Sequence, residues 1–462
     1  MGTSAVRARP EVDDTRFPLL STGFAVALVL DQLWWGGFEV RSLHAVVVLA
    51  AGVVLVRPRS VACFAALAAA EVVSTAVDMP GVGSHRLLLL VVAVVVLAHL
   101  GVSTLRARRL PDPAAAVAQL APFLRASLVV VYASSALAKL NGSFLDPTTS
   151  CAIGMARGVV WFAPGLVSGP WFGPAAILGT VLVEATLPVL LLTRRTRLVG
   201  LVVGAGFHVV LALAGNVPFS AVCLALYVAF LPRDVVERWR PAPGPRVPVA
   251  GRGALVAVLA AGWLVGAALG PVDPSPGLLG RPSGLVSPTL GTATRLVVVA
   301  AVAAGVVALV RSRRGAPEPP PERPAAWGPV PVLGVVVLVI NAMCPYLGLK
   351  TDTSFEMFSG LRTEPGAWNH LVVPEGVRVF GAQEPVRVLA ATDPGLVART
   401  AGGRIVLLEL DRALRAEPGT TAVYSTAADP TPRLLGPLPS GRTVGEWVAT
   451  FRDLPPPGVS RC

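Results

Sequence analysis

Lysine is almost absent from this chain. Lys139 and Lys350 are the only lysines among its 39 basic residues, and all the others are arginine. Charge as a whole is also sparse, since 14% of the 462 residues are charged and 53% are apolar. Water-soluble domains carry about 25% charged residues. The composition therefore excludes an ordinary soluble domain and is typical of a helical protein that crosses a membrane several times.

Cysteine is scarce as well, and its spacing excludes the usual metal and disulfide frameworks. The five cysteines are far apart and form no CxxC pair; they are Cys63, Cys151, Cys223, Cys344 and Cys462. This pattern predicts no zinc site and leaves the disulfide state of Cys151, Cys344 and Cys462 open. The chain also lacks a phosphate-binding GxxxxGK[ST] loop, an HExxH motif and a dinucleotide fingerprint. We therefore expect no metal in this protein.

Long apolar runs are what the sequence has in abundance. We predict about eleven membrane spans, of which the second, third and eighth are short enough to be half-spans or tilted segments. The predicted spans are 18–36, 43–56, 60–77, 86–105, 121–140, 171–193, 197–214, 217–231, 253–270, 295–311 and 329–346.

The arginines alternate between the connecting segments and so predict a topology. One set of connections, which includes the N-terminal tail, holds 20 arginines, and the other set holds five, namely Arg41, Arg86, Arg157, Arg281 and Arg295. Basic residues accumulate on the cytoplasmic side of membrane proteins. The N-terminus is therefore expected in the cytoplasm and residues 347–462 outside, in a multi-pass protein of the cell membrane. The formal net charge of +12 accordingly indicates topology and predicts no nucleic-acid partner.

The composition divides the chain into five predicted parts. These are a cytoplasmic tail (1–17), a transmembrane core (18–311), a proline-rich cytoplasmic linker (312–328), a last span (329–346) and an extracytoplasmic α+β domain (347–462). In the last part, 377–391, 404–414 and 421–426 read as short β-type runs between turn residues. The predicted fold is an all-α polytopic membrane protein with a small strand-rich C-terminal domain.

Ionisable residues at membrane depth are costly, and each one is therefore a functional hypothesis. The candidates are Asp31, Glu71, His85, His99, Lys139, Glu184 and His208. Asp31 and Glu71 read as structural polar groups, and His85 and His208, taken alone, as satisfied structural histidines.

Lys139 is the most informative of these residues, because a chain that otherwise uses arginine places a lysine at the outer end of a predicted span. A desolvated lysine can become a neutral amine and act as a base or nucleophile, whereas arginine stays protonated. Two other interpretations remain open: an ion pair with Glu184, and a lysine that extends to the membrane interface.

Several motifs resemble the vitamin K-dependent gamma-glutamyl carboxylases. "YASSALAKLNGSFLD", with Tyr132 and Lys139, looks like the segment that carries their catalytic lysine base. "GSHRLLLLVV" is similar to their Asn-His pair, with His85 on the histidine and Ser84 in place of the asparagine. A later "FH" helix places His208 on a matching histidine. In "CPYLGLKTDTSFEMFSGLRTE", Glu356 falls on an acidic-Met pair.

The resemblance covers roughly residues 18–365, which is also the extent of the bacterial horizontally transferred transmembrane (HTTM) family. It implies that Lys139 deprotonates a reduced naphthoquinone, of vitamin K or menaquinone type, which reacts with oxygen and becomes the base for carboxylation of a glutamate. His85 and His208 would then assist Lys139 in catalysis, and Glu184, Glu356 and Tyr132 would contact substrate. The predicted partners are the bilayer, the quinone and a peptide or small molecule on the external side. The external domain of about 115 residues is much smaller than the lumenal region of the carboxylases.

Two other classes of function remain open on the sequence alone. A transporter or lipid-handling protein could use Lys139, Glu184 and His208 as a buried proton or ion path, and Lys139→Arg would then keep partial function. A surface-display or assembly protein would depend on residues 347–462 alone and would tolerate apolar replacement of all three residues.

Overall fold

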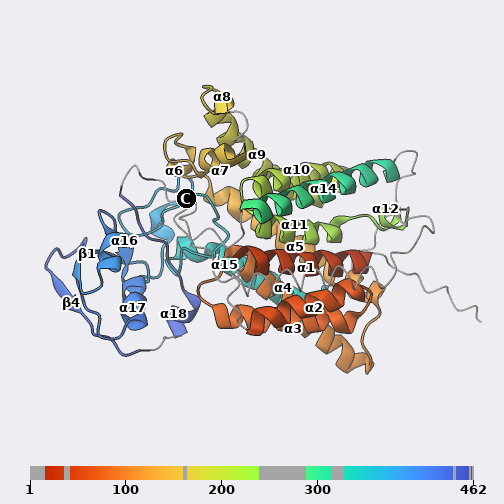
Figure 1. The fold of residues 1–462 in the computed structure, drawn as a ribbon, viewed down its shortest axis with the longest axis horizontal. Coiled ribbons are helices and arrows are strands. Elements are labelled where there is room, and N and C mark those ends of the chain that lie inside the picture. Colours follow the sequence, from red (N-terminus) through yellow and green to blue (C-terminus); the bar gives the residue numbers. More distant parts are fainter. Residues whose placement is uncertain are drawn as a thin grey trace, which may run out of the picture.

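The computed structural model describes residues 16–35, 42–159, 164–238, 288–313, 327–440, 444–456 and 459. These residues form a long body of helices with a small mixed domain at one end (Figure 1). The predicted combination of a helical membrane body and a small C-terminal sheet is confirmed at this level. The tail 1–15, the segment 253–270 and most of the predicted linker lie outside the described residues.

Among the described residues, six helices are long and apolar enough to cross a membrane. They are α1 (Arg16–Trp35), α3 (Val61–Asp78), α4 (Ser84–Ala107), α5 (Pro113–Ala138), α9 (Phe172–Leu192) and α15 (Pro329–Leu347). Shorter apolar helices lie among them, namely α2 (Ser42–Val56), α10 (Arg197–Leu213) and α11 (Val217–Tyr227, continued by η1, Val228–Phe230). Helix α14 (Pro288–Arg313) contributes a shorter apolar stretch, Val298–Ser312. Each predicted span except 253–270 coincides with one of these helices.

Helix α5 lies at the centre of the body. It packs against α9 and α15 most extensively, and also against α1, α4 and α11. Its sequence explains this position, because apolar and small residues surround the helix and most of them are buried in one continuous core. A helix that is apolar all round is a buried helix. The end of α5 therefore delivers whatever polar residues it carries into the middle of the protein.

The connection between α5 and α9 is a set of short helices, where the sequence predicts only a loop. They are α6 (Gly142–Leu145), α7 (Cys151–Val159) and α8 (Pro164–Val167). Helix α7 packs against both α9 and α10, with Ile153 buried in a small apolar cluster. This segment therefore closes one end of the space between those two helices.

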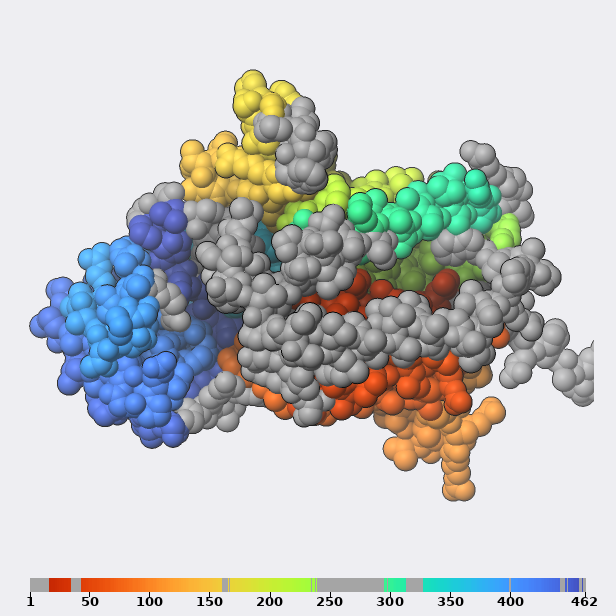
Figure 2. All heavy atoms as spheres, viewed as in Figure 1, coloured from red at the N-terminus to blue at the C-terminus, as the bar shows by residue number. Residues whose placement is uncertain are grey.

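The C-terminal domain contains a four-stranded antiparallel sheet in the order β2-β1-β3-β4. Its strands are β1 (Pro385–Ala391), β2 (Ile405–Val406), β3 (Ala422–Thr426) and β4 (Arg433–Leu435), and its helices are α16 (Pro394–Thr400), α17 (Leu407–Ala416) and α18 (Val444–Val448). The core of the domain joins Val386, Ile405 and Tyr424 of the sheet to Leu410 and Leu414 of α17. Figure 2 shows this domain, in blue, projecting from the end of the helical body.

The prediction of a β-type run over 404–414 is wrong for most of its length. Only Ile405 and Val406 are in a strand, and helix α17 follows at once. Leu410 and Leu414 are fully buried and are spaced four residues apart, as on one face of a helix. The domain is therefore less rich in strands than its composition predicts.

Candidate functional site

Three polar side chains follow one another along a single face of α5. Tyr132, Ser135 and Lys139 are separated by three and four residues, the spacing that places helical side chains above one another. All three are buried. Lys139 follows the last residue of α5 and caps the helix. The face therefore leads from the interior of the bundle to the helix end.

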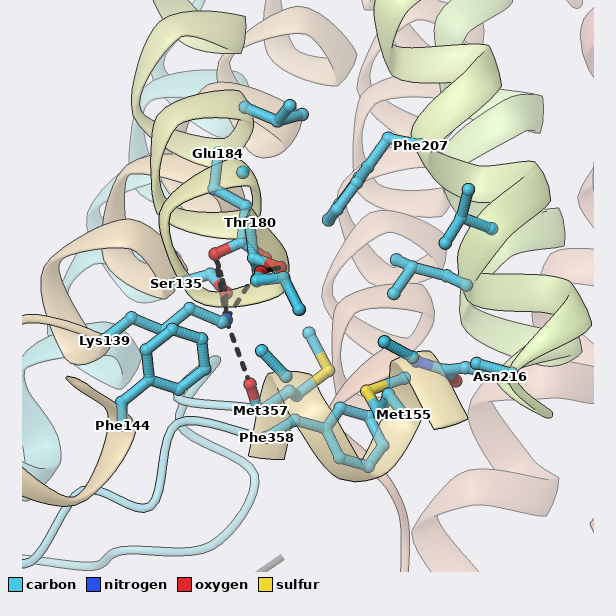
Figure 3. A pocket seen from close by; sticks show the side chains of 18 of the residues that line it. Ser135, Lys139, Phe144, Met155, Thr180, Glu184, Phe207, Asn216, Met357 and Phe358 are labelled. Carbon is cyan, nitrogen blue, oxygen red and sulfur yellow. Dashed lines mark hydrogen bonds and ion pairs between the residues drawn. The ribbon is translucent and has the colours of Figure 1, made fainter. Parts of the chain in front are cut away.

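Lys139 forms an ion pair with Glu184 of α9. Its Nζ lies 2.8 Å from Glu184 Oε2, donates to Glu184 Oε1 at 3.1 Å and donates to Ser135 Oγ at 2.7 Å. Ser135 Oγ in turn donates to Glu184 Oε2 at 3.1 Å. Lys139 is 3% exposed and Glu184 6%. The three side chains form a closed polar triangle in an otherwise apolar interior (Figure 3).

The triangle lies at the edge of a cavity of about 380 Å³. Cavities that bind small molecules measure about 300–1,000 Å³. The walls come from α5, α6, α7, α9, α10 and α11. They are almost entirely apolar apart from Ser135, Lys139, Thr180, Glu184 and Asn216. Four phenylalanines line the cavity, namely Phe144, Phe207, Phe219 and Phe358. The Nζ of Lys139 lies 5.6 Å from the centre of the Phe144 ring. The arrangement fits an apolar, ring-containing ligand with a polar group at one end.

A loop after α15 closes the Lys139 end of the cavity. The carbonyl oxygen of Met357 accepts a hydrogen bond from Lys139 Nζ at 3.2 Å, and the side chains of Met357 and Phe358 line the cavity. Thr353, Phe355 and Phe358 have φ angles of 60°, 61° and 51°. Residues other than glycine rarely adopt this left-handed conformation, and it persists only where the surroundings impose it.

Hydrogen bonds from neighbouring segments hold this loop in place. Asn341 of α15 donates to the carbonyl of Thr353 at 2.9 Å, and Asn141 donates to the carbonyl of Ser359 at 2.8 Å. The loop is therefore a fixed part of the cavity wall.

Glu356 does not line the cavity, although its neighbour Met357 does. It forms an ion pair with Arg452, with a distance of 3.0 Å between Glu356 Oε2 and Nη1, and accepts from Ser359 at 3.2 Å. Burial alone would lower the pKa of Arg452, but the nearby carboxylates of Glu356 and Asp352 outweigh it and raise that pKa above its ordinary value. Glu356 thus ties the C-terminal domain to the loop that contacts Lys139.

Tyr132 and His208 lie together, behind the cavity. The hydroxyl of Tyr132 is 2.5 Å from His208 Nε2 and 2.6 Å from the hydroxyl of Tyr227. His208 is fully buried, and its ring contacts Phe207 and Phe219, which do line the cavity. The Nδ1 of His208 has no hydrogen-bond partner among the described residues. These polar groups support the wall but do not form it.

His85 lies in a different cluster, between α1, α2, α3 and α4. Its Nε2 is 2.7 Å from Asp31 Oδ1. Arg86 is the centre of the cluster, at 2.6 Å from Asp78 Oδ2 and 3.4 Å from Asp31 Oδ2. His44 lies 2.9 Å from Asp78. We call Asp31, His44, Glu71, Asp78, His85 and Arg86 the α1–α4 cluster.

Arg86 corrects one detail of the predicted topology, in which it counts as an ordinary loop arginine. It is buried, with 8% of its surface exposed, and donates to Ser74 and Thr75 besides Asp78. Its charge serves the α1–α4 cluster. Without Arg86, four arginines remain in its set of connections against 20 in the other set, so the bias is stronger.

Two further polar residues pack where the C-terminal segment meets the helices. His370 accepts from the backbone N–H groups of Val372 and Val373 through Nδ1, and its Nε2 lies 2.9 Å from the carbonyl oxygen of Leu137. Burial lowers the pKa of His370. Burial likewise lowers the pKa of Lys350, which donates to Thr353 at 3.0 Å. The second lysine of the chain therefore supports the loop and is absent from the residues that line the cavity.

Metal chemistry has no obvious location in the described part of the chain, where no group of three or more His, Cys, Asp or Glu residues could hold an ion. The cysteines divide into two kinds. Cys63, Cys223 and Cys344 are free, whereas Cys151, at the start of α7, is disulfide-bonded. Cys462 lies outside the described residues.

Several residues that form the site were not predicted from the sequence. Ser135 lies inside the motif that drew attention to Lys139, and its spacing from Lys139 could have identified it. Met357 belongs to the acidic-Met pair of the resemblance, but no local pattern predicts that this loop, more than 200 residues away along the chain, contacts the end of α5.

Comparison with protein-family models, with curated proteins and with solved structures finds no match to this chain.

Proposed function

We propose that this protein is a membrane enzyme that removes a proton from a lipid-soluble quinol, as the resemblance to the vitamin K-dependent carboxylases implies. The observation that carries the proposal is the buried Lys139–Glu184 pair at the polar end of an apolar cavity. A reduced naphthoquinone fits this cavity in chemistry, because it has a flat aromatic body and hydroxyl groups at its rim. When bound, it would contribute two things: reactivity toward oxygen, and the strong base that carboxylation requires.

The Lys139–Glu184 pair is able to accept one proton. Lys139 Nζ and Glu184 Oε2 lie 2.8 Å apart, close enough for a proton to pass between them. The pair is neutral overall, whether as ammonium and carboxylate or as amine and carboxylic acid. Uptake of one proton makes it positive, and this charge lies next to the anion that the ligand becomes. The pair thus acts as a base and also stabilises the product of deprotonation.

The other groups position this pair. Ser135 bonds to both members, and the carbonyl of Met357 takes one further hydrogen bond of the amine. The apolar walls exclude water, which strengthens these interactions and protects a strongly basic species. In this proposal Tyr132, Tyr227 and His208 hold the wall behind Ser135, and His85 acts at a distance by fixing α1 against α4.

Arginine could not replace Lys139 in this role. A guanidinium does not release its proton in a protein, and its planar fork would bind the Glu184 carboxylate through both oxygens. The carboxylate would then no longer accept a proton from the ligand. This is the physical reason for a lysine in a chain that otherwise uses arginine.

We further propose that the cavity end with Lys139 and the C-terminal domain lie on the extracytoplasmic side of a bacterial cell membrane. The distribution of arginines supports this orientation, and the disulfide at Cys151 supports it independently, because disulfides persist in oxidising compartments. The acceptor would then be a peptide or small molecule that reaches the site from outside.

The test is an assay of purified protein in detergent with reduced naphthoquinone and oxygen, in which the quinone epoxide is measured by chromatography and mass. We expect epoxide from the wild type and from Lys350→Arg, and about 10³-fold slower formation by Lys139→Arg. Lys350 is a matched control, because it is the only other lysine and is also buried. Absence of epoxide from the wild type, or a Lys139→Arg variant as active as the wild type, would contradict the proposal.

A second candidate function, proton-coupled transport, is favoured by one specific observation. Ser135 and Tyr132 follow Lys139 along one face of α5, and the Tyr132 hydroxyl contacts His208 of α10 and Tyr227 of α11. Such a row can conduct protons toward the bundle interior. In that case charge rather than basicity matters at position 139, and Lys139→Arg keeps partial transport activity in vesicles.

A further inference from the structure

The cavity wall between α9 and α10 is built from residues with very small side chains. Gly179 of α9 and Gly206 of α10 both line the cavity, and both are exposed at the surface. A Cβ atom added to either would meet no described atom within 4 Å. Ala175 and Val210 line the same wall and are also exposed. The cavity therefore reaches the surface at these four residues, which we call the α9–α10 gap.

The surface around the α9–α10 gap is apolar on both sides. Leu178 and Leu182 of α9 are 63% and 64% exposed, and Val202 of α10 is 37% exposed. Exposed leucines and valines on helices that cross a membrane face its hydrocarbon. Water is not the medium that such a surface meets, so the gap opens toward lipid.

The depth of the gap agrees with this interpretation. Trp171, at the start of α9, is 57% exposed, and exposed tryptophans at span ends mark the membrane interface. At about 1.5 Å per residue, Gly179 lies ~12 Å further along the helix axis than Trp171. Half the hydrocarbon thickness is about 15 Å. Gly179 therefore lies within the hydrocarbon of the outer leaflet.

We propose that the α9–α10 gap is a lateral entrance, through which a ligand dissolved in the outer leaflet reaches the Lys139–Glu184 pair. The loop that contains Met357 and Phe358 covers the other end of the pair, so the membrane side offers the more direct route. Glycine is required at 179 and 206 because larger side chains there would occupy the opening.

The entrance also defines the class of ligand. A molecule that enters here is a bilayer-soluble compound with a slim apolar body and one hydroxyl or other weakly acidic group at its leading end. The body contacts Phe207, Val203 and Met155 on its way, and the acidic group ends at Lys139. A long chain behind that body could remain in the bilayer. The inference rests on the proposed function for the fate of the ligand, but the route itself does not depend on turnover.

The experiment therefore measures access and not activity. Wild-type protein is placed in nanodiscs that contain a phospholipid with a diazirine at the tip of one acyl chain. Such a probe cannot leave the bilayer, and after irradiation the labelled residues are identified by mass spectrometry. We expect labelling of the inward-facing Met155 and Phe207, in addition to the outward-facing Leu178 and Leu182.

Two glycine variants locate the entrance. In Gly206→Trp the labelling of Met155 and Phe207 is lost, while that of Leu178 and Leu182 persists. Gly101→Trp is the matched control, because Gly101 is an exposed glycine of α4 at which an added Cβ atom would also meet no described atom within 4 Å, and it does not line the cavity. We expect this variant to label like the wild type.

Two results would contradict the proposed entrance. One is a wild-type protein in which only Leu178 and Leu182 are labelled. The other is inward labelling that survives in Gly206→Trp as well as in Gly101→Trp. Failure of the epoxide assay alongside normal inward labelling would instead reject the quinol chemistry and leave the entrance standing.

Discussion

The helical body buries two clusters of charged residues, and they differ in what surrounds them. The Lys139–Glu184 pair has a cavity of about 380 Å³ beside it. In the described part of the chain, the α1–α4 cluster borders a hollow of about 10 Å³ at Glu71, which is at the lower limit for a single water molecule. The cavity beside the Lys139–Glu184 pair therefore has room for a ligand, and the hollow at Glu71 does not.

If the proposed function is correct, charge at membrane depth does not by itself identify a functional site, because only one of these two clusters has a cavity of ligand size beside it. In the α1–α4 cluster Arg86 pairs with Asp31 and Asp78, and the histidines at positions 44 and 85 bond to the same aspartates. Such a network fixes four helices relative to one another. The pair at Lys139 has the same kind of contacts but leaves one side open to the cavity. Variants in the two regions should accordingly affect different quantities.

The largest effect is expected on turnover at Lys139. We expect Lys139→Arg to lower the rate of epoxide formation by about 10³-fold, within the range for loss of a general base, with little change in thermal stability because the ion pair is kept. The measurement is the initial rate together with the melting temperature in detergent. Loss of the folded protein in Lys139→Arg would contradict the prediction, because it would mean that the pair supports the fold and not turnover.

The next effect is expected on stability at Arg86. Replacement by methionine leaves Asp31 and Asp78 buried without their cation, and breaking a buried pair in this way costs about 3–5 kcal/mol. Arg86→Met should therefore unfold at lower temperature and accumulate poorly in membranes, and Arg86→Lys should recover part of the loss. A stable Arg86→Met that lacks activity would instead make the α1–α4 cluster part of the active site.

The sequence predicts the region of Lys139 better than it predicts the α1–α4 cluster. The motif around Lys139 singled out that residue, and its ion pair with Glu184 stood among the alternatives. The α1–α4 cluster was predicted only in part. Asp31 and Glu71 read as structural groups, whereas the resemblance assigned a catalytic role to His85. Which helices lie side by side decides these assignments. Long-range packing of apolar helices leaves no local pattern by which to predict it.

In the C-terminal domain, too, packing between distant segments decides structure that local sequence patterns do not predict. The strand over 422–426 follows from alternating residues, but the run at 404–414 becomes a helix because Leu410 and Leu414 complete the core under the sheet. Tertiary packing overrides a local β preference there. The loop at Met357 is the extreme case, since its left-handed residues are held by hydrogen bonds from Asn141, before α6, and from Asn341 of α15.

An intermediate effect is expected at the two histidines, and it separates support from catalysis. His85→Gln should cost about 1–2 kcal/mol of stability through its lost bond with Asp31 and should leave the KM for quinol unchanged. His208→Gln, behind the cavity wall, should raise KM, because Phe207 and Phe219 shift when the ring they contact is replaced. The check is a full kinetic comparison at a temperature where both variants are folded. An unchanged KM in His208→Gln with a changed KM in His85→Gln would reverse the assignment of the two regions.

The smallest effect is expected at His370, which seats the C-terminal segment on the end of α5. Burial lowers its pKa in the folded protein, so the unfolded chain binds a proton more readily than the folded chain. Stability from the neutral ring is then fully present above about pH 6.5 and declines as the pH falls below that value. His370→Gln does not titrate, and the melting temperature of the wild type should therefore fall more steeply between pH 7 and pH 5. Parallel pH profiles for the two proteins would show that His370 is no more buried than a surface histidine. In that case the contact between His370 and the end of α5 would be weaker than the hydrogen bond from His370 to Leu137 indicates.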